Sequence, residues 1–167
     1  MIRSTCLVKL AVIAILATPA PSAAAVAPSM RDVLAATYAV RDLSAVDLAP
    51  DGRTVVWEET FHDPNRLLGS TRSSALYAQP LEGGARMRIT AGNGGTTYDE
   101  ETPLWSPNGR EIAFLSDAHS KGQLQIYVAA ADGVHIRQLG NLRGDVQRLS
   151  WSPSGRTLAF LYIAAAH

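Results

Sequence analysis

The chain has 167 residues, of which 47% are hydrophobic and 18% are charged, and this composition is typical of a globular domain rather than of a disordered segment. Fifteen basic residues balance fifteen acidic ones, so the formal net charge at pH 7 is zero. There is no basic excess of the kind that nucleic-acid-binding proteins carry, and we expect no nucleic-acid partner.

The first 25 residues have the pattern of a secretory signal peptide. Arg3 and Lys9 precede the apolar run 10–17, and the small residues Ala23–Ala25 follow it. We therefore expect cleavage after Ala25 and a periplasmic or secreted protein. The apolar run is too short to span a bilayer, so no stable membrane anchor is expected after cleavage.

Removal of this segment changes the charge and the cysteine content. It leaves 13 basic residues against 15 acidic ones, a net charge of −2, and it removes the single cysteine, Cys6. No disulfide is then possible. Residues 26–45 are predicted to form a leader with a short helix from Ser29 to about Tyr38, because Ser29 can cap it and Asp32 lies in its first turn.

A short motif built around a proline and a glycine occurs three times without gaps. The glycine lies two positions after the proline, an arginine three positions after it, and an aromatic residue seven positions after it. The matched residues are Pro50, Asp51, Gly52, Arg53 and Trp57; Trp105, Ser106, Pro107, Asn108, Gly109, Arg110 and Phe114; and Trp151, Ser152, Pro153, Ser154, Gly155, Arg156 and Phe160. Proline followed by Asp, Asn or Ser and then glycine favours a tight turn between two strands. The motif residues are therefore predicted to be structural, and the tryptophans and phenylalanines to pack in the core.

The motif belongs to a longer repeating unit of four strands. In the first unit, strands are expected near 46–48, 54–59, 75–78 and 88–89, with a polar loop at 60–74; in the second, at 104–106, 111–116, 124–129 and 136–139. The apolar run 112–115 does not alternate with polar residues, which indicates a sheet covered on both faces. The motif prolines lie 57 and then 46 positions apart. A period of about 40–50 residues with four strands is typical of a β-propeller blade.

We therefore predict an all-β chain that forms a partial β-propeller of four-stranded antiparallel blades. Blade 1 is expected at 46–95, blade 2 at 96–142, and the first half of blade 3 at 143–167, about two and a half blades in all. Propellers usually close with about 4–8 blades. We therefore expect the chain to be the truncated beginning of a longer polypeptide, with an exposed edge strand at 158–163. The alternative is a short protein that assembles with copies of itself or with partners.

The second copy of the motif, 104–114, resembles the Trp-Ser-Pro-Asp-Gly blade motif of TolB-like propellers and of the N-terminal propeller of the prolyl oligopeptidase family of serine peptidases, with Asn108 in place of the aspartate. The chain order is also similar to that of bacterial dipeptidyl or acylaminoacyl peptidases of this family. A signal peptide and a short helix come first. A degenerate first copy of the motif follows at 48–52, and a threonine-containing segment at 99–103 leads into the second copy. The resemblance covers nearly all of the mature chain.

This resemblance implies a non-catalytic segment. In the peptidases the nucleophilic serine lies in a Gly-x-Ser-x-Gly elbow of a hydrolase domain that follows the propeller, and no such sequence occurs here. We expect no catalytic residue, cofactor or metal site in this chain. In the intact relative the propeller would gate the access of peptide substrates. The alternative function is a TolB-like periplasmic module that binds a protein partner.

The remaining polar candidates have structural interpretations. The histidines lack metal-ligand spacing and are expected at the surface. The run 99–101 could bind a cation or a peptide amino terminus, but a solvated loop between blades is favoured. The repeated arginines could line a rim that attracts acidic ligands, although a structural role is favoured. The glycine clusters 83–84 and 92–95 are expected to be turns. The histidines are His62, His119, His135 and His167, and the arginines are Arg53, Arg110 and Arg156.

Overall fold

The computed structural model describes residues 29–30, 41–61, 73–93 and 98–164. The expected signal peptide, nearly all of the expected helix at 29–38, and two of the four histidines, His62 and His167, lie outside the described residues. No helix within the described ranges has the length and apolar character needed to cross a membrane.

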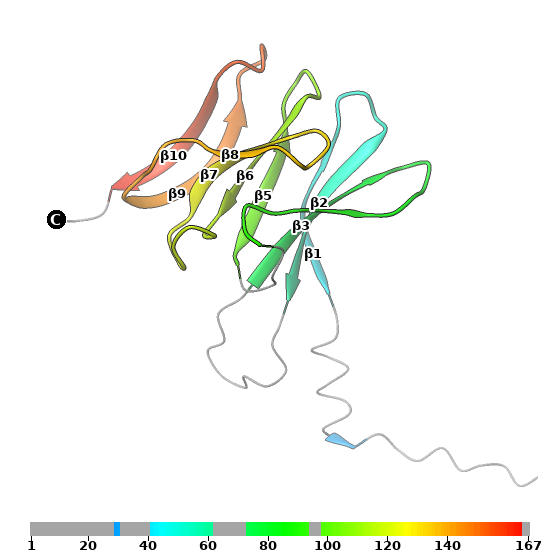
Figure 1. The fold of residues 1–167 in the computed structure, drawn as a ribbon, viewed down its shortest axis with the longest axis horizontal. Coiled ribbons are helices and arrows are strands. Elements are labelled where there is room, and N and C mark those ends of the chain that lie inside the picture. The colour runs from blue at the N-terminus through cyan, green and yellow to red at the C-terminus, as the bar shows by residue number, and fades with distance from the viewer. Residues whose placement is uncertain (1–28, 31–40, 62–72, 94–97, 165–167) are drawn as a thin grey trace, which may run out of the picture.

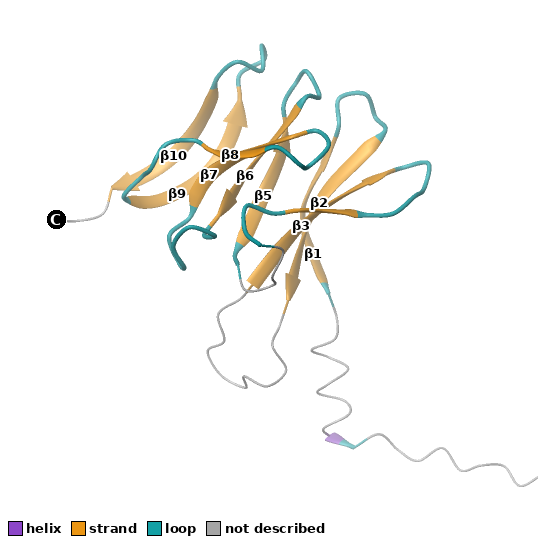
Figure 2. Cartoon of the chain, viewed as in Figure 1, coloured by secondary structure: helices purple, strands orange, loops and turns teal. Residues whose placement is uncertain are grey.

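The described residues form ten strands in three antiparallel sheets that stand side by side (Figures 1 and 2). The first sheet has the order β1 (Asp42–Leu48), β2 (Thr54–Phe61), β3 (Ser73–Pro80) and β4 (Met87–Ile89). The second has the order β5 (Glu100–Trp105), β6 (Glu111–Ser116), β7 (Gln125–Ala130) and β8 (Ile136–Gln138). The third pairs β9 (Gly144–Trp151) with β10 (Leu158–Ala164). The prediction of an all-β partial propeller with four-stranded blades is confirmed.

The first strands of the first and second sheets begin earlier than predicted. β1 begins at Asp42 rather than at 46, and β5 begins at Glu100 rather than at 104. Each of these strands contains a register shift at which the pairing skips residues. Such a bulge lets a strand continue through residues that break the alternating pattern. The ends of the predicted loop at 60–74 are also strand, in β2 and β3.

The three motif turns share one geometry. The glycine at each turn has a positive φ, +71° at Gly52 and +67° at Gly109 and Gly155. Its N–H donates to the carbonyl oxygen of the residue just before the proline, and the distance is 2.8 Å in all three turns. An L-residue with a β-carbon rarely adopts this φ, so glycine is the residue that closes the hairpin without strain.

The second sheet is buried on both faces, as the apolar run 112–115 indicated. On β6, Phe114 packs into a cluster with the first sheet, which includes Val56 and Leu76. Its neighbour Leu115 packs into a second cluster with Val146 of β9. Successive side chains of a strand point to opposite faces. The apolar residues of β6 therefore bind the second sheet to both of its neighbours.

The prediction that every motif aromatic residue packs in the core is wrong for Phe160, which is 40% exposed. In the two four-stranded sheets, the equivalent aromatic ring stacks on a tyrosine of the third strand. The ring centroids of Trp57 and Tyr77 are 5.9 Å apart, and those of Phe114 and Tyr127 are 5.7 Å apart. Among the described residues no third strand pairs with β10, so the ring of Phe160 has no such partner.

The expected exposed edge strand is present as β10. Its apolar residues Leu161, Tyr162 and Ile163 are 51%, 40% and 56% exposed. Within the described part of the chain, β10 has a hydrogen-bonded neighbour on one side only, which is β9. This edge and its apolar face are open to a further strand.

Candidate functional site

The first strand of each sheet carries one residue with a strained backbone at the same repeat position. These residues are Ala45, Thr102 and Arg148, with φ of 45°, 52° and 49°. Each lies five positions before the motif proline and within a bulge of its strand. Positive φ in residues other than glycine costs on the order of 1–3 kcal/mol, and it persists where the surrounding structure imposes it. Bulges redirect side chains, and here they do so at three equivalent places.

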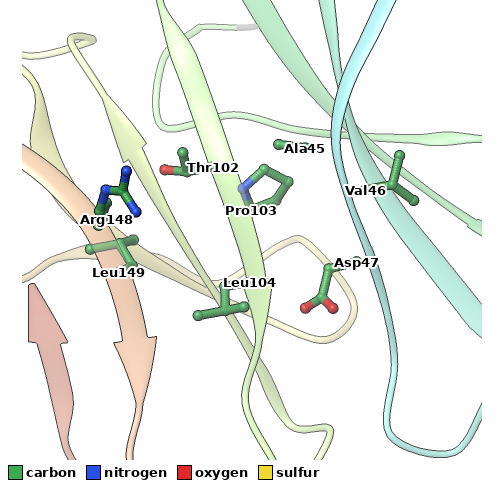
Figure 3. Close-up of a pocket in the computed structure, with 8 residues that line it drawn as sticks. All are labelled: Ala45, Val46, Asp47, Thr102, Pro103, Leu104, Arg148 and Leu149. Atoms are coloured by element: carbon green, nitrogen blue, oxygen red, sulfur yellow. The ribbon is translucent and has the colours of Figure 1, made fainter.

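The three bulges meet in one groove of about 360 Å³ (Figure 3). It is lined by Ala45, Val46 and Asp47 of β1, Thr102, Pro103 and Leu104 of β5, and Arg148 and Leu149 of β9. β5 contacts both β1 and β9. Because the blades of a propeller surround a central channel, we assign this groove to the channel side of the sheets.

Hydrogen bonds between neighbouring sheets fix the walls of the groove. Asp47 of β1 accepts a bond from the backbone N–H of Trp105 in β5 at 2.7 Å. The indole N–H of Trp151 in β9 donates to the carbonyl oxygen of Leu104 at 3.2 Å. The backbone N–H of Thr102 donates to the Glu58 carboxylate of β2 at 3.3 Å. The relative positions of the three strands are therefore set by directional contacts as well as by apolar packing.

The polar groups of the groove differ from one end to the other. In Figure 3, Arg148 lies at one end and Asp47 lies at the opposite end, with Pro103 and Leu104 between them. The Asp47 carboxylate is occupied, since it also accepts the backbone N–H of Leu48 at 3.0 Å. Arg148 is exposed, and no carboxylate of the described residues forms an ion pair with it. The groove thus offers a cation at one end and an apolar floor.

The acidic run 99–101 is not the solvated loop that was expected. Glu100 opens β5 and is fully buried. Its carboxylate accepts bonds from Arg88 Nη2 at 2.9 Å, Thr90 Oγ1 at 2.7 Å and the backbone N–H of Ala91 at 2.9 Å. The donors belong to β4 and the residues just after it, so Glu100 connects the second sheet to the first.

The other polar candidates do not converge on a site. His119 and His135 are exposed, and His135 Nδ1 lies 3.7 Å from the carboxylate of Asp132. No group of three or more potential metal ligands occurs within the described residues. The motif arginines Arg53, Arg110 and Arg156 are exposed on the turns and do not line the groove.

Sequence reasoning missed the bulge residues that line the groove. Ala45, Thr102 and Arg148 share no side-chain chemistry, so no residue-type motif marks them. Their constant distance from the motif proline was the one available signal, and it indicates position rather than function.

Tyr127 provides a pH-dependent probe of the packing between the first two sheets. Burial, followed by the negative charges of Asp117 and Glu100, raises the pKa of Tyr127 above its ordinary value of 10.0. A pKa raised in the folded state contributes stability below pH 10, and this contribution is lost as the pH rises through the folded-state pKa. We expect Tyr127→Phe to reduce the loss of unfolding free energy between pH 8 and pH 11, as measured by urea unfolding. An identical alkaline loss in wild type and Tyr127→Phe would contradict the assignment.

Comparisons with known proteins agree with this fold. No protein-family model matches the chain. Over 82 residues the chain is 32% identical to dipeptidyl-peptidase 5 of Porphyromonas gingivalis, a match that covers 49% of this chain and 11% of that protein.

Among solved structures, the acylaminoacyl peptidase of Pyrococcus horikoshii matches with a TM-score of 0.56 at 20% identity, over 73% of this chain and 17% of that one. The β-propeller domain of the Trilobed protease from Pyrococcus furiosus gives 0.54 at 20% identity, over 74% and 34%. A TolB-like structure from Agrobacterium tumefaciens gives 0.52 at 22% identity, over 70% and 37%.

These comparisons confirm the resemblance to TolB-like propellers of prolyl oligopeptidase-type peptidases. At these identities the structural matches establish the propeller fold alone. The chain spans about a tenth of the length of the dipeptidyl-peptidase and at most 37% of the three structures.

Proposed function

We propose that this chain is a non-catalytic propeller segment of an exported, prolyl oligopeptidase-like serine peptidase, in which it admits peptides and excludes folded proteins. The observation that carries the proposal is the similarity to dipeptidyl-peptidase 5, in a chain whose stacked sheets bring three equivalent strands to one groove. The apolar segment 10–17 supports export.

Selection of substrates by size requires that neighbouring sheets of the propeller stay joined. The bonds from Trp105 to Asp47 and from Trp151 to Leu104 join the first strands of successive sheets, and buried Glu100 joins the first two sheets farther from the groove. If these sheets stay joined in the intact propeller, it would pass extended segments and exclude folded proteins. Its contribution to catalysis is therefore the choice of substrate.

The bond-breaking chemistry is assigned to residues outside this chain. The sequence has no Gly-x-Ser-x-Gly elbow, and without the elbow, the base and the oxyanion hole, acyl transfer does not proceed. Peptide hydrolysis would then require a hydrolase domain in the same polypeptide.

A TolB-like interaction module is the second candidate function. Its support is the fold shared with TolB structures from Agrobacterium tumefaciens and Acinetobacter baumannii, with TM-scores of 0.52 and 0.53. In this role the propeller would bind a periplasmic protein and would have no hydrolase.

The reading frame beyond His167 distinguishes the two functions. The gating proposal expects further blades followed by a Gly-x-Ser-x-Gly sequence, and it expects the protein expressed from that frame to cleave dipeptidyl substrates but not a folded protein of the same composition. A frame that ends after the blades, or an expressed protein without peptidase activity, would overturn it in favour of the interaction module. Fractionation of the cells that produce the protein tests export. The export part of the proposal would be wrong if the protein remained in the cytoplasm.

A further inference from the structure

We propose that the groove between β1, β5 and β9 binds the C-terminal carboxylate of a peptide, with Arg148 as the residue that recognises it. This inference rests on the proposed function for the kind of ligand, a peptide, and goes beyond it by naming which part of the peptide is bound and by which side chain.

Arg148 gives one end of the groove a positive charge, while the Glu58 carboxylate accepts the backbone N–H of the lining residue Thr102. Arg148 is exposed and has no ion-pair partner among the described residues. The motif arginines Arg53, Arg110 and Arg156 do not line the groove, so they would not bind an anion there. A guanidinium group presents several N–H donors in a plane that matches the two oxygens of a carboxylate.

A second hydrogen-bond donor lines the same groove. The hydroxyl oxygen of Thr102 is buried and has no hydrogen-bond partner within the described residues, and its side chain lines the same groove. A buried hydroxyl without a hydrogen-bond partner is unfavourable. A small rotation of this side chain toward a ligand oxygen would satisfy it.

The bulges place these two groups together. Thr102 and Arg148 occupy the same position of successive repeats, and both have a positive φ. In a regular strand their side chains would follow the alternation of the sheet instead. The strained backbone is therefore what brings both donors to the groove.

The rest of the groove favours a ligand with a single negative charge at its end. Pro103, Leu104 and Leu149 form an apolar floor next to Arg148 (Figure 3), suited to an apolar side chain near the peptide terminus. At the far end, the carboxylate of Asp47 would repel a second anion. A peptide that ends in an apolar residue with a free carboxylate matches this distribution.

The test is a titration of the full chain with fluorescent peptides of one apolar sequence, read by anisotropy. The first peptide has a free C-terminus, the second an amidated C-terminus, and the third an amidated C-terminus and an internal glutamate. We expect the free carboxylate to bind at least about fivefold more tightly than the amide, as one charge-assisted contact at a partly exposed site provides. The internal glutamate should give no such gain.

Substitutions at Arg148 and Thr102 test whether these residues cause the preference for the free carboxylate. Arg148→Ala should abolish the difference in binding between acid and amide, and Thr102→Val should reduce the difference about twofold. Arg156→Ala is the matched control, an exposed arginine on the β9–β10 hairpin outside the groove, and it should keep the full preference. Circular dichroism checks that each variant is folded.

Equal binding of acid and amide by the wild type, no binding of either peptide, or a preference that survives Arg148→Ala would overturn the proposal. An equal gain from the internal glutamate would show that the groove reads acidic side chains and would also overturn it. These outcomes are independent of the gating test. If the protein is a peptidase but does not prefer the free carboxylate over the amide, only the groove assignment is wrong. If it shows this preference but has no hydrolase domain, only the gating proposal is wrong.

Discussion

Replacing Glu100 with alanine is expected to lower the free energy of unfolding by about 3–5 kcal/mol, because it removes the buried carboxylate that forms an ion pair with Arg88. The Arg88 side chain is only 18% exposed and the Glu100 side chain is fully buried, so water replaces the lost carboxylate poorly. The backbone N–H of Ala91 and the hydroxyl of Thr90 would also lose their acceptor. Urea unfolding followed by tryptophan fluorescence measures the change.

Glu111→Ala is the matched control for this prediction. Glu111 of β6 also forms an ion pair with an arginine, Arg137 of β8, at 3.0 Å. These two side chains are 33% and 57% exposed, respectively. Exposed pairs contribute about 0–1 kcal/mol, and the control should fall in that range. Equal losses from the two substitutions would show that Glu100 does not connect the sheets as described.

The second large effect is expected at Phe114. Phe114→Ala should destabilise the chain by about 3–5 kcal/mol, since it removes a fully buried ring from the core between the first two sheets. The loss of its stacking on Tyr127 adds to the effect. The change in unfolding free energy is again read from urea unfolding.

Phe160→Ala tests the same repeat position in the third sheet. Because Phe160 is 40% exposed and lies on a strand paired on one side within the described residues, its removal should cost less than about 1 kcal/mol. A loss at Phe160 as large as that at Phe114 would mean that both rings are equally enclosed, which the open third sheet does not allow.

Much of the fold could be predicted from the sequence because the repeat combines two strong local signals. The proline and glycine of each turn fix where the chain reverses, and the unbroken apolar run in β6 indicates burial on both faces. Repetition of these signals makes each one more reliable than it would be alone. The period of about 40–50 residues with four strands indicated the blade architecture, and the resemblance to peptidase propellers agreed with it.

The candidate site could not be predicted in the same way. The groove depends on bulges at Ala45, Thr102 and Arg148, and no property of these side chains requires a positive φ there. Glu100 was expected in a solvated loop because nothing in its sequence neighbourhood shows that Arg88 and Thr90 approach it across a sheet boundary. Exposure of Phe160 also depends on long-range neighbours rather than on local sequence.

The central claim is that the chain forms an open array of propeller blades, and amide hydrogen exchange of β6 and β10 tests it most directly. β6 is paired on both sides, with β5 and β7, whereas β10 is paired with β9 on one side only within the described residues. We expect slow exchange along β6 and fast exchange at alternate residues of β10, whose N–H groups point away from β9. Uniform protection of β10 equal to that of β6 would contradict the account.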